Sequence, residues 1–192
     1  MVAEANSDMP ARYRQAMDRI DACNKQDPNG REYDYSLALT RWVLSLQPEA
    51  SEALRLAARA QHIARWQIPR DTYPQGRNGY LRWRKDLMKF HAATAADILS
   101  ACGYDQTMIE RVKSIMLKKR IKEDQETQTL EDALCLVFME RQLEDFKEQV
   151  DEDKLANVIR KTWNKMSQQG HEAAMSLPLP DSTRRFIERT LS

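Results

Sequence analysis

The sequence TLEDALCLVFM occupies residues 129–139 and includes the most apolar run of the chain, Ala133 to Met139. In a helix these apolar side chains would lie on all sides rather than along one stripe, and such a helix is normally enclosed by others. Thr129 and Asp132 have the spacing of a capping box, which marks the start of a helix. We therefore predict that a helix beginning at Thr129 forms the centre of a helical bundle.

The rest of the chain shows the apolar spacing typical of helices and no alternating strand pattern. Glycine and proline occur mainly where helices should end. Besides the central helix, the expected helices cover about residues 10–25, 32–46, 49–66, 80–102, 107–121, 153–169 and 181–191. We expect one all-α domain over residues 1–192, a bundle of about seven or eight helices, with residues 1–9 flexible and residues 178–192 forming a C-terminal helical extension.

Composition indicates a globular protein inside the cell. Of the 192 residues, 42% are hydrophobic and 31% charged, so the chain can bury a core. No stretch approaches the roughly 20 apolar residues of a membrane span, and the first ten residues show no secretory signal. Cys23, Cys102 and Cys135 are far apart and odd in number, which suits a reducing compartment. We expect a cytoplasmic protein with no membrane partner.

The net charge of +1 conceals a separation of the two signs along the chain. Residues 55–91 hold nine arginines and lysines against Asp71 and Asp86, whereas residues 123–153 hold twelve acidic residues against Arg141 and Lys147. Near-neutral totals with separated signs favour a local electrostatic field over a uniformly basic nucleic-acid binder.

Two consecutive predicted helices carry histidine, arginine and aromatic residues. His62 and Arg65 are three residues apart on the first, so their side chains should be neighbours. Tyr80, Arg84 and His91 share a face of the second by the same spacing. Consecutive helices usually pack side by side. We therefore predict that His62 and His91 face each other across a cleft walled by arginines.

Arginine forks bind phosphate and carboxylate groups through paired hydrogen bonds, and aromatic rings stack on flat groups. Lys119 falls on the apolar stripe of Met108, Val112 and Ile115, where a lysine either extends to solvent or pairs with a buried anion; with Lys118 beside it, we favour the anion. The alternative is that the arginines and tryptophans only cover the surface and cap carbonyls. The candidate ligand-binding residues are Arg65, Trp66, Arg70, Arg77, Tyr80, Trp83, Arg84, Lys118 and Lys119.

His62, His91 and Asp132 are the candidate catalytic residues. An imidazole titrates near neutral pH, so either histidine can serve as a general acid or base. The same three side chains are also the candidate ligands of a divalent metal ion, since zinc and related metals take nitrogen and carboxylate donors. Nothing in their spacing enforces a common centre. The alternative role of Asp132 is the capping box with Thr129.

Five motifs give the chain a resemblance to a known family. They are HIARW at residues 62–66, YLRWR at 80–84, KFH at 89–91, KKR at 118–120 and QTLED at 128–132. With these motifs the sequence resembles, from about Arg12 to Leu191, the family catalogued as domain of unknown function 4202. The resemblance brings no activity with it. It implies that these five motifs are the signature of the family.

The chain is also weakly similar to the HD-domain metal-dependent phosphohydrolases, which are helical bundles. That similarity implies that His62 matches the first histidine, His91 the histidine of the His-Asp pair and Asp132 the final aspartate. Ala92 stands where the aspartate of the pair is expected, so the metal centre would be altered.

These observations lead us to expect an enzyme that acts on an anionic, phosphorylated or nucleotide-like small molecule. One alternative is a non-catalytic module that binds an anionic ligand at the same residues. Another is an RNA-binding protein, suggested by the basic segment with interleaved aromatic residues. The acidic half of the chain argues against an extended basic track, so nucleic acid is not the expected partner.

Overall fold

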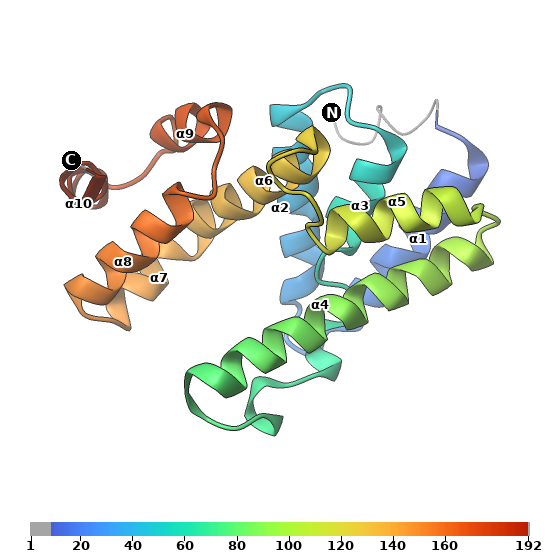
Figure 1. Cartoon of the computed structure of the whole chain (residues 1–192), viewed down its shortest axis with the longest axis horizontal. Helices are drawn as coiled ribbons and strands as arrows, with labels where there is room; N and C mark the ends of the chain where they lie inside the picture. Colours follow the sequence, from blue (N-terminus) through green and yellow to red (C-terminus); the bar gives the residue numbers. More distant parts are fainter. Residues whose placement is uncertain (1–8, 192) are drawn as a thin grey trace.

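The structure is a computed structural model that describes residues 9–191, and within this range the chain forms helices and no strand. The flexibility predicted for residues 1–9 cannot be compared with the structure, because all of these residues except Met9 lie outside the described part. The helices are α1 (Ala11–Asn24), α2 (Arg31–Leu46), α3 (Glu52–Ala60), α4 (Gly76–Ala101), α5 (Gln106–Met116), α6 (Gln125–Arg141), α7 (Leu143–Glu148), α8 (Glu152–Trp163), α9 (Gln168–Met175) and α10 (Asp181–Leu191). The all-α bundle expected from the sequence is confirmed (Figure 1).

Helix α6 is central, as its apolar sequence predicts. It packs against α2, α3, α5, α7 and α9, and it joins the two parts of the molecule seen in Figure 1. The start of α6 differs from the prediction. Asp124 caps the helix by accepting from the backbone N–H of Glu126, while the Thr129 hydroxyl donates to the Gln125 carbonyl. The predicted capping box of Thr129 and Asp132 is therefore wrong.

The N-terminal part of the bundle closes around α3, a short helix rich in alanine. Ala53, Ala57 and Ala60 are buried, and their small side chains let α1, α2, α4, α5 and α6 all contact this helix. Buried residues of the N-terminal and C-terminal helices form one hydrophobic core. Such a core stabilises the fold mainly by removing apolar surface from water.

Helices α7 to α10 form the second part, which packs on α6 through α7 and α9 (Figure 1). The helix expected for residues 153–169 is two helices, because α8 ends at Trp163 and the Ser167 hydroxyl caps α9. Gly170 is not the expected stop but lies inside α9. A Cβ at this position would stand 2.8 Å from the Asp132 carboxyl carbon, so only glycine allows α9 to approach α6 this closely.

Helix α4 is the longest, and its first half extends beyond the bundle (Figure 1). Two short 3-10 helices, Arg65–Gln67 and Arg70–Thr72, precede it and run back along this half. Trp83 holds them there, because its indole Nε1 donates to the Ile68 carbonyl at 2.9 Å. Within residues 9–191, no helix is both long and apolar enough to cross a membrane.

Candidate functional site

His62 lies in the turn that follows α3. The sequence predicted a helix to residue 66, but α3 ends at Ala60 and Ala64 has a left-handed backbone with φ of +54°. A non-glycine residue pays roughly 1 kcal/mol or more for this conformation, and such residues often occur at functional sites. The turn directs His62 and Arg65 away from the α3 axis toward α4.

The structure brings His62 and His91 together, with ring centroids 5.8 Å apart. His91 is 3% exposed, and its Nδ1 lies 2.6 Å from the Ile63 carbonyl oxygen. Because a carbonyl only accepts, we assign the proton to Nδ1, which leaves a lone pair on Nε2. Nε2 is buried and has no hydrogen-bond partner. Burial lowers the pKa of His91 to about 4, so His91 is a neutral acceptor at neutral pH.

His62 is also neutral. Its ring stacks on Tyr35 with the centroids 4.4 Å apart and the planes 14° from parallel. Burial, and then the neighbouring charge of Arg65, hold the pKa of His62 well below its usual value, with smaller effects from His91, Lys118 and Arg84. About a quarter of the side chain remains exposed, so His62 is the more accessible of the two imidazoles.

Glu32, in the first turn of α2, completes the histidine cluster. One carboxylate oxygen lies 3.7 Å from His62 Nδ1 and the other 3.7 Å from Arg65 Nε. Burial raises the pKa of Glu32 to about 7, against the opposing effect of Arg65. Glu32 therefore exchanges a proton close to neutral pH, directly beside His62.

Lys118 enters the site from the loop between α5 and α6. The Glu131 oxygen Oε2 accepts no hydrogen bond but is paired with the Lys118 ammonium, and the Lys165 ammonium lies 3.6 Å from Oε1. Burial works to raise the pKa of Glu131, but the two lysines outweigh it, so this pKa is lowered and the carboxylate stays charged. Lys118 itself has a left-handed backbone with φ of +53°.

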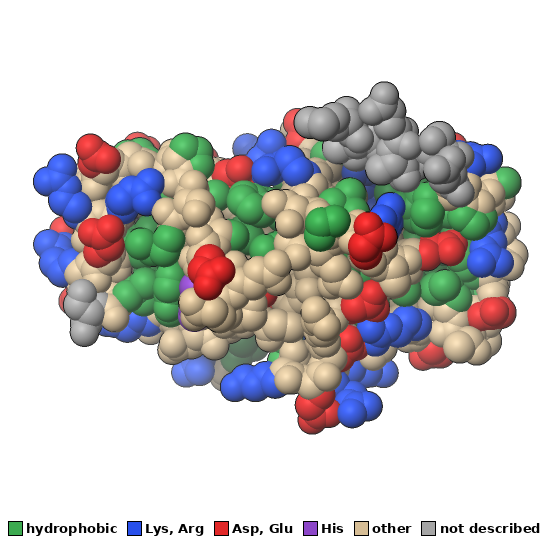
Figure 2. All heavy atoms as spheres, turned by 90° about the horizontal axis from the view of Figure 1, so that it is seen from above, with side chains coloured by type: hydrophobic (Ala, Val, Ile, Leu, Met, Phe, Trp, Pro, Cys, Tyr) green, Lys and Arg blue, Asp and Glu red, His purple; other side chains and the backbone are tan. Residues whose placement is uncertain are grey.

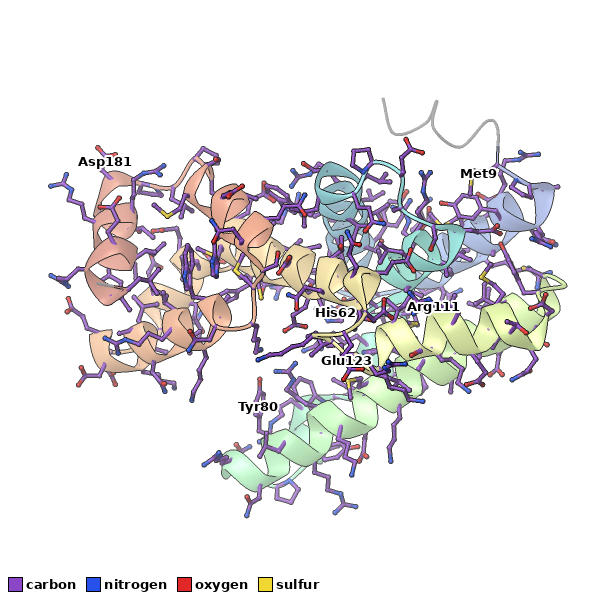
Figure 3. The ribbon with its side chains drawn as sticks, turned by 45° about the horizontal axis from the view of Figure 1, so that its top comes forward. Met9, His62, Tyr80, Arg111, Glu123 and Asp181 are labelled. Atoms are coloured by element: carbon purple, nitrogen blue, oxygen red, sulfur yellow. The ribbon has the colours of Figure 1, made fainter. Side chains whose placement is uncertain are left out.

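The loop that carries Lys118 is anchored at its far end. Arg111 of α5 forms ion pairs with Asp124 and Glu126 at the start of α6, and Figure 3 shows Arg111 near the end of this loop that also holds Glu123. The hydrogen bond from Arg111 is the main cause that lowers the pKa of Asp124 to about 2. These ion pairs thus fix the end of the loop that leads into α6, whereas Lys118 lies at its other end.

Asp132 has a different role from that expected. Its Oδ1 accepts from Gln128 Nε2 at 2.9 Å and from the Ser167 backbone N–H at 2.8 Å, and its Oδ2 accepts from the Ser167 hydroxyl. Asp132 therefore joins α6 to the turn before α9. Among residues 9–191, no group of three or more His, Cys, Asp and Glu side chains is arranged to hold a metal ion. The geometry gives no support to a metal centre of His62, His91 and Asp132.

Of the candidate arginines and tryptophans, some lie in the histidine cluster and others hold the loop, pack against the core or are exposed to solvent. Arg65 belongs to the cluster, with its guanidinium 4.8 Å from the centre of the Trp83 ring. Arg70 donates to the carbonyls of residues 73 and 74 and so organises the loop, which is the carbonyl-capping alternative. Trp66 packs against the core, and Arg77 is exposed.

Lys119 does not fall on an apolar stripe, because α5 ends at Met116 before reaching it. Its side chain is exposed, whereas that of Lys118 pairs with the buried anion. Arg84 lies on the exposed side of α4, close enough to lower the pKa of His62. The structure therefore brings together His62, His91 and Arg65, with Arg84 and Lys118 near enough to lower the pKa of His62.

Glu32, Tyr35 and Lys165 were not among the site residues predicted from the sequence. Glu32 lies in the first turn of α2, where an acidic residue is favourable in any case, so it does not stand out in the sequence. Glu131 carried a usable signal, since a charge within the most enclosed helix needs a buried partner. A groove of about 380 Å³ elsewhere along α4 and α5 contains none of the predicted site residues.

These features define an all-α protein with a buried pair of neutral histidines flanked by arginine and lysine side chains. The chain belongs to the family described as "Domain of unknown function (DUF4202)", which matches residues 14–187. No curated protein and no solved structure matches the chain, so the weaker similarity to HD-domain phosphohydrolases gains no support.

Proposed function

We propose that this protein is an enzyme that acts on an anionic, phosphorylated small molecule by general acid–base catalysis at His62 and His91. The observation that carries the proposal is the unpartnered, buried Nε2 of His91, which lies beside His62 and near enough to Arg65 for that charge to lower its pKa. Arg65, Lys118 and Arg84 act in the same way on His62. A buried polar atom without a partner costs about 1–3 kcal/mol, a cost that a bound ligand would remove.

His91 can only accept a hydrogen bond at Nε2, because Nδ1 is committed to the Ile63 carbonyl. The group that it receives must therefore be a donor, such as a hydroxyl of the substrate or a water molecule. Arg65, Arg84 and Lys118 would hold the anionic group beside it and stabilise negative charge that develops during the reaction. No step here requires a metal ion.

His62 and Glu32 are the proposed route for the proton. His62 is exposed enough to meet a substrate, and Glu32 lies beside its Nδ1 with a pKa of about 7. A group that titrates near the working pH is suited to accept and return a proton. Asp132 is left out of the reaction, because both its oxygens bind the turn before α9.

The test is a screen of the purified protein against phosphate monoesters, pyrophosphate and nucleotides, with turnover and thermal stabilisation as readouts. Stabilisation by phosphorylated compounds together with turnover by any of them supports the proposal. No stabilisation and no turnover across the panel would overturn it. Lys154→Ala is a suitable control, because Lys154 is exposed at the start of α8.

A binding module for an anionic ligand is the second candidate. One observation favours it, since a histidine whose pKa is about 4 is a weak base at neutral pH. His62→Ala and His91→Ala separate the two candidates. Loss of turnover with ligand affinity retained supports the enzyme, whereas wild-type protein that binds without turnover supports the module.

RNA binding has less support. Acidic and basic side chains are mixed on the face that Figure 2 shows, rather than separated into a continuous basic track. We further propose a cytoplasmic location, on the ground that Cys23, Cys102 and Cys135 are free thiols.

A further inference from the structure

We infer that the anionic ligand is a nucleoside phosphate, whose base stacks on Tyr80 while its phosphates reach Arg65 and Arg84 and its terminal end lies at the histidine pair. This inference rests on the proposed function, because it names the substrate class of the same site. It is carried by a series of contacts that connects Tyr80 with His62.

The series begins on the half of α4 that extends beyond the bundle. Tyr80 and Trp83 have ring centroids 5.9 Å apart, and the Arg65 guanidinium lies 4.8 Å from the Trp83 ring. Arg65 in turn contacts Glu32, which contacts His62. The order of this series is therefore an exposed tyrosine ring, the buried Trp83 ring, a guanidinium, the Glu32 carboxyl group and an imidazole.

Helix geometry supports the same order independently. Tyr80, Arg84 and His91 occur at positions i, i+4 and i+11, which share one face of α4. With a rise of 1.5 Å per residue, Tyr80 is about 16 Å from His91 along the helix axis and Arg84 about 10 Å. A phosphate group cannot cover this length, but a base, a sugar and a chain of phosphates in line can.

Tyr80 is well suited to bind a base. It is 43% exposed, which is unusual for a large aromatic side chain, and it leans on Trp83 at 43° with the Arg84 guanidinium 5.9 Å from its ring. Figure 3 shows Tyr80 on the outer half of α4 and His62 at the junction of the helices. A base stacked on tyrosine contributes about 1–3 kcal/mol of binding free energy.

The cations lie between the two ends. Arg84 is exposed, and Arg65 is about one-third exposed, so both guanidinium groups can reach a ligand. Arginine binds phosphate through paired hydrogen bonds, which fixes the direction of the phosphate chain. The end of that chain would then lie at His62, whose side chain is about a quarter exposed, with the buried and unpartnered Nε2 of His91 directly behind it.

The experiment compares ADP, ribose 5-phosphate and pyrophosphate as ligands of the full chain by calorimetry. We expect ADP to bind at least about fivefold more tightly than either of the others, because only ADP carries a base. Tyr80→Ala should reduce the affinity for ADP to that for ribose 5-phosphate, and Tyr80→Phe should restore it. The control is Leu81→Ala, which removes the adjacent and slightly more exposed side chain without touching the aromatic series.

Each outcome supports or overturns the inference that the ligand is a nucleoside phosphate. Equal binding of ADP and ribose 5-phosphate would overturn the nucleotide inference and leave the proposed function standing. Equal losses in Tyr80→Ala and Leu81→Ala would also overturn it, since a general disturbance of α4 would explain both. Binding of a short RNA without binding of ADP points to a nucleic-acid partner and contradicts the inference. Binding of none of these ligands contradicts the proposed function as well.

Discussion

Two polar clusters lie at the end of α3, one around Arg59 and one around His62, three residues further along the chain. They differ in whether their polar atoms have hydrogen-bond partners within the protein. Arg59 is 7% exposed and binds both oxygens of Asp21, at 2.6 and 2.9 Å. His62 and His91 form the other cluster, where Nε2 of His91 has no partner. The Arg59 guanidinium and the Asp21 carboxylate satisfy each other, whereas Nε2 of His91 has no hydrogen-bond partner among the described residues.

The comparison teaches how to distinguish a structural polar cluster from a functional one in this fold. Replacing one partner of a closed ion pair leaves a buried charge alone, which is strongly destabilising. His62 is held by stacking on Tyr35, which another aromatic ring can keep, so an aromatic replacement there should cost the fold little. Stability and ligand binding should therefore respond in opposite ways at the two ends of this short turn.

The largest expected effect is at Arg59. In Arg59→Met, Asp21 loses its partner while the volume of the side chain is roughly kept, and we expect a loss of about 3 kcal/mol in unfolding free energy. Urea unfolding measures this loss. Arg189→Ala should change the value by less than about 0.5 kcal/mol, because the Arg189–Glu152 pair is mostly exposed. Replacing both Arg59 and Asp21 by apolar residues should recover most of the loss; a further loss would show that the ion pair is not self-contained.

An intermediate effect is expected for Glu32, and it depends on pH. The pKa of Glu32 is about 7 in the folded chain and near 4.5 when unfolded, so the folded state binds more protons between these values. The stabilisation from this proton is complete below pH 4.5 and is lost as the pH rises toward 7. The side chain of Glu32→Gln cannot ionise. Between pH 5 and 8 the unfolding free energy of the wild type should therefore fall by roughly 1–3 kcal/mol relative to that of the variant.

The matched control for Glu32→Gln is Glu123→Gln, which changes an exposed carboxylate in the loop between α5 and α6. Its unfolding free energy should follow the wild type at every pH. If Glu32→Gln and the wild type also stay parallel from pH 5 to 8, Glu32 does not have a raised pKa, and its place in the proton route is lost.

The smallest effect on stability is expected for His62→Phe. Phenylalanine can keep the stacking on Tyr35, so the unfolding free energy should change by less than about 1 kcal/mol. The same variant should lose any turnover found with phosphorylated compounds. A loss of stability as large as that of Arg59→Met would place His62 with the structural cluster and remove the contrast between the two ends of the turn.

Most of the fold could be predicted from the sequence because its signals are local. The apolar run of α6 identified the central helix, and Pro48 and Gly103 marked where α2 and α4 end. The contact between His62 and His91 also followed from a local rule, since they belong to consecutive segments that pack together. These features depend on residues close in sequence, where spacing alone carries the information.

The rest of the site depends on departures from ideal helices and on distant contacts. The left-handed backbone at Ala64 and Lys118 ends two helices earlier than periodicity suggests, and this moves the site from Lys119 to Lys118. Glu32 reaches the histidines from α2, and Lys165 reaches Glu131 from the turn between α8 and α9, far away in sequence. Spacing within one segment cannot show such contacts, and only a charge within an enclosed helix, as at Glu131, hints at them.

The adjacent residues Glu131 and Asp132 also decide how the molecule can be divided. Glu131 contacts Lys165, and Asp132 binds Ser167 against the glycine at position 170, so one turn of α6 fastens the chain segment that leads into α9. A shortened protein that ended after α7 would leave Glu131 with Lys118 alone and Asp132 with Gln128 alone. The C-terminal helices are thus a wall of the site, and engineering that treats them as a removable appendage would alter its charge.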